Sequence, residues 1–236
     1  MKHLAVAALA LAAGLALALV AAPAADAPKK EAPVIPPRHG KSETIKLFDG
    51  KDLDGWEGRM DRWSVEDGEI VGKTKDGQKV STYLLTKRKF SDFRLTAKGK
   101  LVESEMHTGI AFWGRRAPEH GDPYTYAGLL VMFPSGWGMY DLFGRNGLPV
   151  NPAPAKKVGK QHDWNDLEIL AQGNRVRVAV NGAAVVDWRD PEPQRLMEGP
   201  IGLQLHSNTA PEEVRFKDIT VTTFPEEDRL ITVKEK

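Results

Sequence analysis

Short runs of alternating apolar and polar residues, separated by Gly, Asn, Asp and Pro, fill most of the chain from residue 44 onward. No long segment after the N-terminal apolar run repeats apolar side chains with the period of a helix. Alternating runs with turn residues at close intervals are typical of antiparallel strands joined by hairpins. The sequence therefore predicts an all-β sandwich. The predicted strands are 44–48, 62–66, 69–73, 81–86, 92–102, 105–113, 126–133, 137–143, 164–171, 174–180, 183–188, 199–206 and 213–223.

Three dipeptides have the residues that tight hairpin turns require: Asp67-Gly68, Gly173-Asn174 and Asn181-Gly182. Gly, Asn and Asp tolerate the positive φ angles of such turns. Two connections, 114–125 and 144–163, are too long for a hairpin turn. Because long loops inside compact domains are more often functional than incidental, we expect these two to border or cover a site.

An unbroken apolar run from Leu4 to Val20 stands near the start of the chain, and small residues follow it. This pattern predicts a secretory signal peptide over 1–25. The alternative is a membrane anchor that is retained, for which the run is slightly short of the roughly 20 residues that a span needs. Cleavage would leave an exported bacterial protein, periplasmic or extracellular, without a membrane span.

Three regions follow the signal peptide. Residues 26–43 are rich in Pro and charge, which predicts an extended linker that packs against nothing. Residues 44–225 predict the folded domain, and 226–236 a C-terminal tail. The chain has no Cys, so packing has to stabilise the domain without disulfides. Thiolate nucleophiles and Cys-ligated zinc are excluded for the same reason.

The charges of the chain nearly balance. Lys and Arg number 33 and Asp and Glu number 32, for a formal net charge of +1. A chain this close to neutral has no bulk field that attracts nucleic acid or an anionic membrane. We therefore expect no nucleic-acid partner, and a compact ligand that is neutral or weakly charged.

The segment 199–206, GPIGLQLH, shows clear two-residue alternation. Its apolar side chains point to one face, and the other face carries two polar side chains, Gln204 and His206. A His in such a place acts as a general base near neutral pH, as a metal ligand or as a plain surface residue, and the sequence leaves these alternatives open. In the next strand the alternation shifts at Lys217-Asp218, which predicts a bulge.

Residues 101–113, LVESEMHTGIAFW, are interpreted as one extended stretch with two faces. The face predicted to enter the core holds Val102, Met106, Ile110 and Phe112. The opposite face holds Glu103, Glu105, His107 and Trp113. Small residues between these side chains would leave room for a ligand beside two carboxylates and an imidazole. The alternative is a solvated outer face, where charged residues are expected.

Aromatic residues cluster between 113 and 143. Aromatic rings stack on the apolar faces of pyranose sugars while polar neighbours bond the hydroxyls, so this mixture favours a carbohydrate groove. We expect Phe112 and Phe133 in the core, and Trp137 and Tyr140 are candidates to face the ligand. Polar candidates at the edges of these segments, for which plain solvation is the alternative, are Arg115, Arg116, Asp141 and Arg145.

Four parts of the chain together resemble the bacterial 3-keto-disaccharide hydrolases, also described as 3-keto-glucoside lyase/hydratases. The four parts are LFDGKDLDGW (47–56) with WSVEDGEIVG (63–72), TGI (108–110), WNDLEI to VVDW (164–188) and IGLQLH to VRFKDI (201–219). The resemblance implies a concanavalin-like jelly-roll sandwich of two antiparallel sheets, exported by bacteria that degrade saccharides.

The resemblance also implies a chemistry, with a saccharide or keto-sugar as the ligand. A ketone at C3 acidifies the hydrogen at C2; a base removes it, donors stabilise the enolate, the C1 substituent leaves, and water adds back. The implied base is His206, or the pair Glu105 and His107. Whether a divalent metal polarises the carbonyl oxygen is left open. Arg115 or Gln204 would supply the donors. Together with the candidates named above, the predicted ligand-binding residues are Trp113, Arg115, Trp137, Tyr140, Asp141, Arg145 and Gln204.

Two places depart from the family pattern. The chain reads His-Thr-Gly-Ile at 107–110 where the family typically reads Asn-Ser-Gly-Ile, and 126–137 has no carboxylate where the family carries Glu-x-Gln. The Glu-x-Asp-x-x-Glu strand of concanavalin-like glucanases is also missing, so glycoside hydrolysis by two carboxylates is not supported. The sequence favours an exported enzyme that cleaves 3-keto-glycosides. A non-catalytic carbohydrate-binding module is the alternative.

Overall fold

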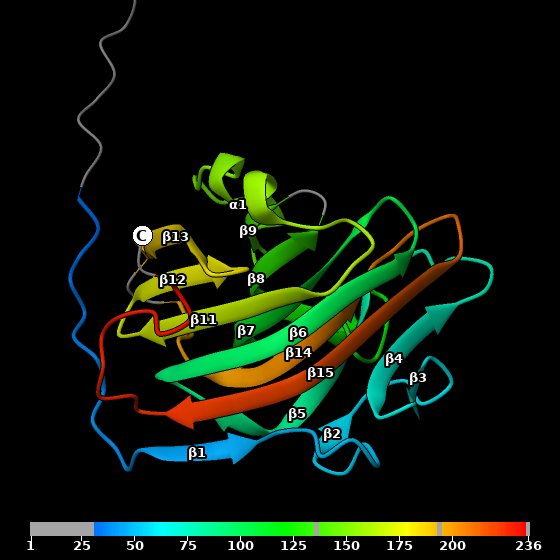
Figure 1. Ribbon diagram of the computed structural model, residues 1–236, viewed down its shortest axis with the longest axis horizontal. Helices are drawn as coiled ribbons and strands as arrows, with labels where there is room; N and C mark the ends of the chain where they lie inside the picture. Colours follow the sequence, from blue (N-terminus) through cyan, green and yellow to red (C-terminus); the bar gives the residue numbers. More distant parts are fainter. Residues whose placement is uncertain (1–30, 135–136, 193–194, 235–236) are drawn as a thin grey trace, which may run out of the picture. The chain divides into compact units, whose positions relative to one another are not determined.

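The structure, a computed structural model, describes residues 31–134, 137–192 and 195–234. Its strands form one eight-stranded and one seven-stranded antiparallel sheet, within a single unit that spans Ala32–Lys236. Figure 1 shows β6, β11 and β15 in a front layer, with β14, β7 and β8 behind them. The predicted all-β jelly-roll sandwich of two antiparallel sheets is therefore confirmed.

The eight-stranded sheet has the order β13-β12-β11-β6-β15-β4-β3, and β1 pairs with β15 beside this path. Figure 1 shows β15 along β6 through most of its length. The strands of this sheet are β1 (Glu43–Lys46), β3 (Trp63–Glu66), β4 (Glu69–Thr74), β6 (Phe93–Glu103), β11 (Asn165–Gln172), β12 (Arg175–Val180), β13 (Ala183–Arg189) and β15 (Glu212–Thr223).

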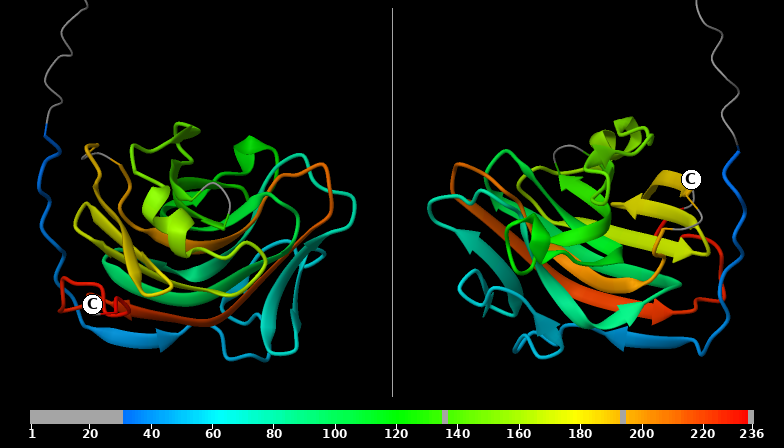
Figure 2. Two further views of the ribbon diagram at one scale, coloured as in Figure 1. Left: turned by 45° about the horizontal axis from the view of Figure 1, so that its top comes forward. Right: turned by 180° about the vertical axis from the view of Figure 1, so that it is seen from behind.

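The seven-stranded sheet has the order β10-β9-β8-β7-β14-β5-β2. The right-hand view of Figure 2 brings this layer forward, with β14 in orange among green strands. Its strands are β2 (Trp56–Glu57), β5 (Thr82–Phe90), β7 (His107–Arg116), β8 (Tyr126–Pro134), β9 (Gly138–Asp141), β10 (Asn146–Gly147) and β14 (Gly199–Leu205).

Every strand predicted from the sequence has a counterpart in the structure, with ends that differ by a few residues. Three short elements were not predicted from the sequence: the two-residue strands β2 and β10 and the helix α1 (Ala153–Val158). A 3-10 turn at Pro118–His120 lies in the first of the two predicted long loops. Elements this short leave almost no periodic signal in a sequence.

The main core lies between the sheets and contains the inward side chains of both. The rings of Phe93 and Phe112 meet edge-on at 5.7 Å between centroids, and those of Phe133 and Phe216 do so at 6.0 Å. Edge-to-face pairs of this kind add to the stabilisation from burial itself. Phe112 and Phe133 are fully buried, which confirms their assignment to the core.

A smaller apolar cluster covers the face of the seven-stranded sheet that points away from the eight-stranded sheet. Successive side chains of a strand point to opposite faces, so Leu84 belongs to the main core while Tyr83 and Leu85 belong to the smaller cluster. Tyr126 and Leu130 of β8 complete this cluster from a neighbouring part of the sheet. We call this side of the seven-stranded sheet its outer face.

Local chain geometry confirms two predictions of turns and bulges. Asn181 and Gly182 have φ angles of 49° and 84°, as a tight hairpin between β12 and β13 requires. The register between β15 and β6 shifts between Lys217 and Thr220, and Asp218 has a φ of 53°. The phase shift in the sequence therefore corresponds to a bulge.

The interpretation of 101–113 as one extended stretch is wrong. A turn with Ser104 at a φ of 94° separates β6 from β7. Val102 and Met106 were predicted for the core, but they lie beside this turn and are 36% and 38% exposed. Beyond the turn the predicted alternation holds, and Ile110 is fully buried.

The prediction that the linker packs against nothing is wrong for its second half. Asn174 donates its side-chain amide to the carbonyl of Pro33 at 2.7 Å and accepts a hydrogen bond from the backbone N–H of Ile35 at 3.0 Å. The backbone N–H of Arg38 donates to Asp92 at 2.5 Å. These bonds hold the segment against the domain, a contact that Pro-rich composition does not reveal.

The predicted signal peptide, 1–25, lies outside the described residues. In the part of the chain that the structure describes, no helix has the length and apolar character needed to cross a bilayer.

Candidate functional site

A cavity of about 270 Å³ opens on the outer face of the seven-stranded sheet. Alternation along β14 builds one wall of it, because Leu203 and Leu205 enter the main core while the residues between and after them face outward. The residues predicted from the sequence that line this cavity are His107, Tyr140, Arg145, Gln204 and His206.

An imidazole pair is the central feature of the cavity. The ring centroids of His107 and His206 lie 4.2 Å apart, with the rings tilted by 55°. Burial lowers the pKa of His107 from 6.5 to about 4, and the neighbouring charge of His206 acts in the same direction. Burial also lowers the pKa of His206. Both imidazoles are therefore neutral at pH 7, and each has a nitrogen lone pair that can accept a proton.

The backbone of His206 is held in place while its ring nitrogen stays available. The backbone N–H donates to Glu212 Oε1 at 3.0 Å, and the carbonyl accepts from Gln78 Nε2 at 3.1 Å. His206 Nδ1 is buried and has no hydrogen-bond partner among the described residues. Buried polar atoms are normally paired, so this atom is suited to bonding a ligand.

Gln204 and Tyr83 supply a second polar group. Gln204 Nε2 donates to the Tyr83 hydroxyl at 3.0 Å, while Gln204 Oε1 is buried without a partner in the described ranges. Because the Tyr83 oxygen accepts this bond, its O–H proton is left to donate elsewhere. Burial raises the pKa of Tyr83 well above its ordinary value of 10. The hydroxyl therefore remains protonated and acts as a donor.

Arg145 and Tyr140 border the same cavity with a positive charge and an aromatic ring. Tyr140 lies on β9, opposite Leu130 of β8. Arg145 stands just before β10 at a φ of 56°, at the beginning of the predicted loop 144–163. The rest of this loop does not border the cavity, since its helix α1 buries Ala155 in the main core.

The structure contradicts the prediction that Glu105 shares the site with His107. Glu105 lies on the turn between β6 and β7, where its side chain is 84% exposed and contacts His162 Nε2 at 2.9 Å. Arg115 is also outside the cavity, and it pairs with Glu119 at 2.7 Å on the surface. Glu105 was misplaced because alternation was counted across the turn at Ser104.

Two predicted aromatic ligand contacts belong to the core instead. Trp113 is 1% exposed because a bulge after Phe112 and a φ of 48° turn its ring inward. Trp137 is 7% exposed, and its ring lies 6.3 Å from that of Phe133. Neither indole lines the cavity, so neither ring stacks on a ligand that is bound there.

Asp141 is likewise occupied by internal contacts. Its carboxylate accepts hydrogen bonds from the backbone N–H of Phe143 at 2.9 Å and from Arg195 Nη2 at 3.0 Å. The side chain is nearly buried and does not line the cavity. It fixes the end of β9 beside Tyr140 rather than binding a ligand.

Tyr83 lines the cavity but was not among the site residues predicted from the sequence. Residues 81–86 were predicted as a strand, but nothing in the sequence tells which strand pairs with it. The pairing of β5 with β14 places Tyr83 directly opposite Gln204. Alternation along 81–86 was the only signal that could have placed this hydroxyl on the outer face.

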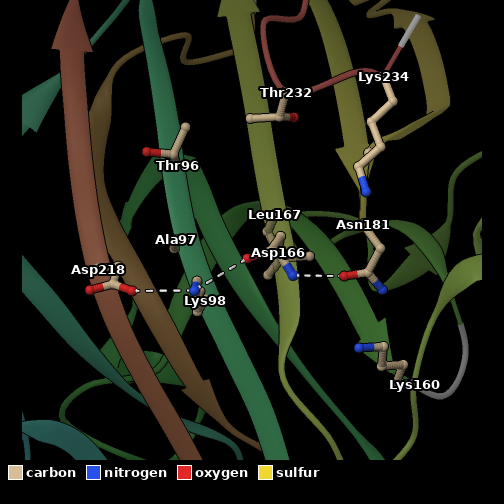
Figure 3. A pocket seen from close by; sticks show the side chains of 11 residues that line it. Thr96, Ala97, Lys98, Lys160, Asp166, Leu167, Asn181, Asp218, Thr232 and Lys234 are labelled. Atoms are coloured by element: carbon tan, nitrogen blue, oxygen red, sulfur yellow. Dashed lines mark hydrogen bonds and ion pairs between the residues drawn. The ribbon is translucent and has the colours of Figure 1, made fainter.

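A larger hollow of about 510 Å³ lies on the solvent side of the eight-stranded sheet. Figure 3 shows Lys98 of β6 between Asp218 and Asp166, at 3.7 Å and 3.8 Å from their carboxylates. The backbone N–H of Asp166 donates to Asn181 at 2.9 Å. The charges at the centre of this hollow offset one another, so we place the candidate site at the imidazole pair.

No group of three or more His, Asp or Glu side chains converges like a metal-ligand set in the described part of the chain. The cavity itself offers two imidazoles and the amide oxygen of Gln204.

The two antiparallel sheets form a jelly-roll sandwich, a fold that several solved proteins share. The chain belongs to the family of 3-keto-alpha-glucoside-1,2-lyase-like domains, whose sequence profile matches residues 43–222. No curated protein matches the chain.

Three solved structures illustrate the shared fold. A candidate glycosyl hydrolase from Parabacteroides distasonis matches with 20% identity and a TM-score of 0.57, over 77% of this chain and 94% of that one. A lichenase derived from a mouse hindgut metagenome matches with 15% identity and a TM-score of 0.51, over 78% and 99%. A galectin-like protein from Bacillus subtilis matches with 13% identity and a TM-score of 0.54, over 79% and 98%. At these identities the similarity shows the fold alone.

Proposed function

We propose that this protein is an exported, carbohydrate-active enzyme that cleaves 3-keto-glycosides by proton abstraction, elimination and hydration. The observation that carries the proposal is the neutral imidazole pair on the wall of a small cavity that also holds hydroxyl and guanidinium donors. The family membership supports the same chemistry. A cavity of about 270 Å³ is at the small end of ligand pockets, which suits one sugar ring better than a long oligosaccharide.

The proposed reaction needs a base and donors in one place. A neutral imidazole, His107 or His206, accepts the proton from C2 beside the C3 ketone, and the electron pair moves to the carbonyl oxygen. Tyr83 and Arg145 donate to the enolate oxygen that forms. The enolate then re-forms the ketone as the C1–O bond breaks, and the leaving oxygen takes the proton from the imidazolium. Water adds across the resulting double bond, so the net reaction is hydrolysis.

The described lining of the cavity favours this route over a two-carboxylate mechanism. It contains two His, two Tyr and one Arg, and no Asp or Glu. Retaining and inverting glycosidases generally need two carboxyl groups across the scissile bond. The same lining also fits a second candidate function, a non-catalytic carbohydrate-binding module. Binding alone requires hydrogen-bond donors and apolar surface but no base.

The test is turnover of 3-keto-trehalose and of a 3-keto-glucoside, with and without EDTA, followed by the release of 3-keto-glucose. We expect His206→Ala and His107→Ala to lower kcat/KM by about 10²- to 10⁴-fold, the usual contribution of a general base. The matched control is His120→Ala, an exposed imidazole on the 3-10 turn, which should leave kcat/KM unchanged. EDTA decides whether a metal takes part.

The pH profile adds a second readout. Because burial lowers the pKa of both imidazoles, the acid limb of kcat/KM should lie below pH 6.5. If the protein binds glycans but turns over none of these substrates, the proposed enzyme is wrong and the carbohydrate-binding module is the better assignment. Export is tested on the same protein, whose mature N-terminus, when recovered from the periplasm or medium, should begin after residue 25.

A further inference from the structure

A second hollow opens at the other end of the same outer face. It measures about 520 Å³, nearly twice the volume of the imidazole cavity. The strand β5 runs past both, since Tyr83 lines the cavity while Lys87 and Lys89 line the hollow. Four residues of a strand span about 13 Å. The two hollows are therefore neighbours on one face, and Leu85, which lines the second one, belongs to the same apolar cluster as Tyr83. We call the second hollow the basic groove.

Positive charge dominates the basic groove. Its charged lining consists of five cations and two carboxylates, namely Arg38, Lys87, Lys89, Arg115, Arg116, Glu57 and Glu198. The excess of three positive charges in one groove contrasts with a formal charge of +1 for the whole chain. A groove with one sign of charge raises the local concentration of ligands of the opposite sign.

Contacts within the protein orient three of these cations, and only one of the three contacts is with a carboxylate. Arg38 Nη1 donates to the backbone carbonyl of Met197 at 2.6 Å, and the Arg116 guanidinium lies 5.3 Å from the centre of the Tyr124 ring. The one ion pair recorded for a groove cation in the described residues joins Arg115 to Glu119. Both partners are about half exposed, and exposed pairs of this kind contribute little and exchange readily.

The floor of the basic groove is apolar. Leu85 is fully buried beneath it, Pro200 of β14 lies beside it, and Leu196 at its edge is 47% exposed. A sugar ring presents apolar C–H faces as well as hydroxyls, so an apolar floor between charged walls suits a saccharide that carries anionic groups. Arg and Lys bind carboxylate and sulfate oxygens by charge-assisted hydrogen bonds.

We propose that the basic groove binds an anionic saccharide, one that carries uronic acid or sulfate groups. The site is separate from the imidazole cavity, and binding there needs neither His107 nor His206. The described lining of the groove has no aromatic side chain. This favours a saccharide over a nucleic-acid strand, whose bases are bound by stacking on aromatic rings. The charge recognised lies on the ligand's substituents, not on its ring.

The test is isothermal titration calorimetry with an oligogalacturonate, a neutral glucan of the same length and a single-stranded oligonucleotide, each at low and high salt. Wild type should bind the oligogalacturonate, and the affinity should fall as salt rises. The double variant Lys87→Ala/Lys89→Ala should bind about tenfold more weakly, which corresponds to the loss of about 1.4 kcal/mol. The matched control is Lys156→Ala/Lys157→Ala, which removes the same charge from α1.

Each result decides the proposal. Equal weakening by the two double variants would show that net charge alone attracts the ligand, and equally tight binding of the glucan or the oligonucleotide would also overturn it. His206→Ala should bind the oligogalacturonate like wild type. Loss of turnover in that variant supports the proposed function, and intact binding of the oligogalacturonate supports the basic groove as a separate site. The two proposals can therefore fail independently.

Discussion

Glu212 is a buried carboxyl that accepts a hydrogen bond from the backbone N–H of His206. Only 1% of the residue is exposed, and this burial raises its pKa from 4.5 to about 7, against the opposing effect of the His206 hydrogen bond. Between pH 4.5 and pH 7 the Glu212 carboxyl therefore holds a proton in the folded protein that it has released in the unfolded chain. The stability contributed by this residue therefore falls as pH rises from about 4.5 to 7.

We expect Glu212→Gln to remove this dependence, because the amide keeps an oxygen for the His206 N–H and has no proton to lose. The free energy of unfolding of the variant, relative to wild type, should rise between pH 5 and pH 8 by up to about 3 kcal/mol. Urea unfolding at several pH values measures this difference in the free energy of unfolding. Glu226→Gln, at an exposed position, is the control. If the difference between Glu212→Gln and wild type does not change with pH, the raised pKa of Glu212 is wrong.

At the scale of single residues, alternation within one regular strand was a reliable guide. Gln204 and His206 were placed on the correct face because β14 is regular from Gly202 to Leu205, after a register shift between Pro200 and Gly202. Glu105 and Trp113 were misplaced because a turn at Ser104 and a bulge at Trp113 each change the phase by an amount that composition does not encode. Both irregularities need a residue at positive φ, yet neither uses glycine.

At the scale of elements, a glycine allows the end of the short helix α1 to lie close against the sandwich. A Cβ on Gly159 would lie 2.0 Å from the Trp137 ring. Trp137 packs in turn on Phe133, so the close approach connects the end of α1 to the main core. The predicted loop 144–163 therefore includes an anchored segment in its second half.

Gly159→Ala should destabilise the protein by about 1–3 kcal/mol, the usual cost of forcing an extra carbon into a packed site. The control is Gly147→Ala, since a Cβ at Gly147 meets nothing within 4 Å. Chemical denaturation of the two variants compares them directly. Equal stability would mean that the loop can move away from Trp137 at no cost.

The sequence predicted strands better than it predicted their partners. Local alternation and turn chemistry located β5, β7 and β14, but pairing depends on contacts between residues that are far apart in the chain. Tyr83 was missed for this reason, as it reaches the cavity only through the pairing of β5 with β14. The same holds for the linker, whose contacts with Asn174 depend on a hairpin more than a hundred residues away.

At the scale of the whole molecule, the C-terminal tail closes over a buried ion pair. Glu168 of β11 is completely buried and pairs with Arg94 of β6 at 3.0 Å. The same carboxylate accepts from the backbone N–H groups of Ile231 at 3.0 Å and of Thr232 at 2.9 Å. The predicted tail, 226–236, thus supplies hydrogen bonds that a buried charge requires.

Ending the chain after Glu226 should destabilise the protein by about 3 kcal/mol or more, because Glu168 would keep Arg94 as a partner and lose the tail. For a domain of this size, that loss lowers Tm by roughly 6–12 °C. Ending the chain after Lys234 keeps these bonds and is the control. Differential scanning calorimetry measures both, and equal Tm values would show that the tail does not support the pair.

The order of strands in the two sheets has a consequence for how the chain folds. β14 lies between β7 and β5, and β15 lies between β6 and β4, so the last two strands to be synthesised complete the middle of both sheets. Until they arrive, each sheet is interrupted, with open strand edges at the gap. In the eight-stranded sheet β1 also lacks its partner, because it pairs with β15. Folding to completion therefore waits for the last part of the domain. A chain that stops before Gly199 leaves the edges of β1, β4, β5, β6 and β7 unpaired and prone to mispairing.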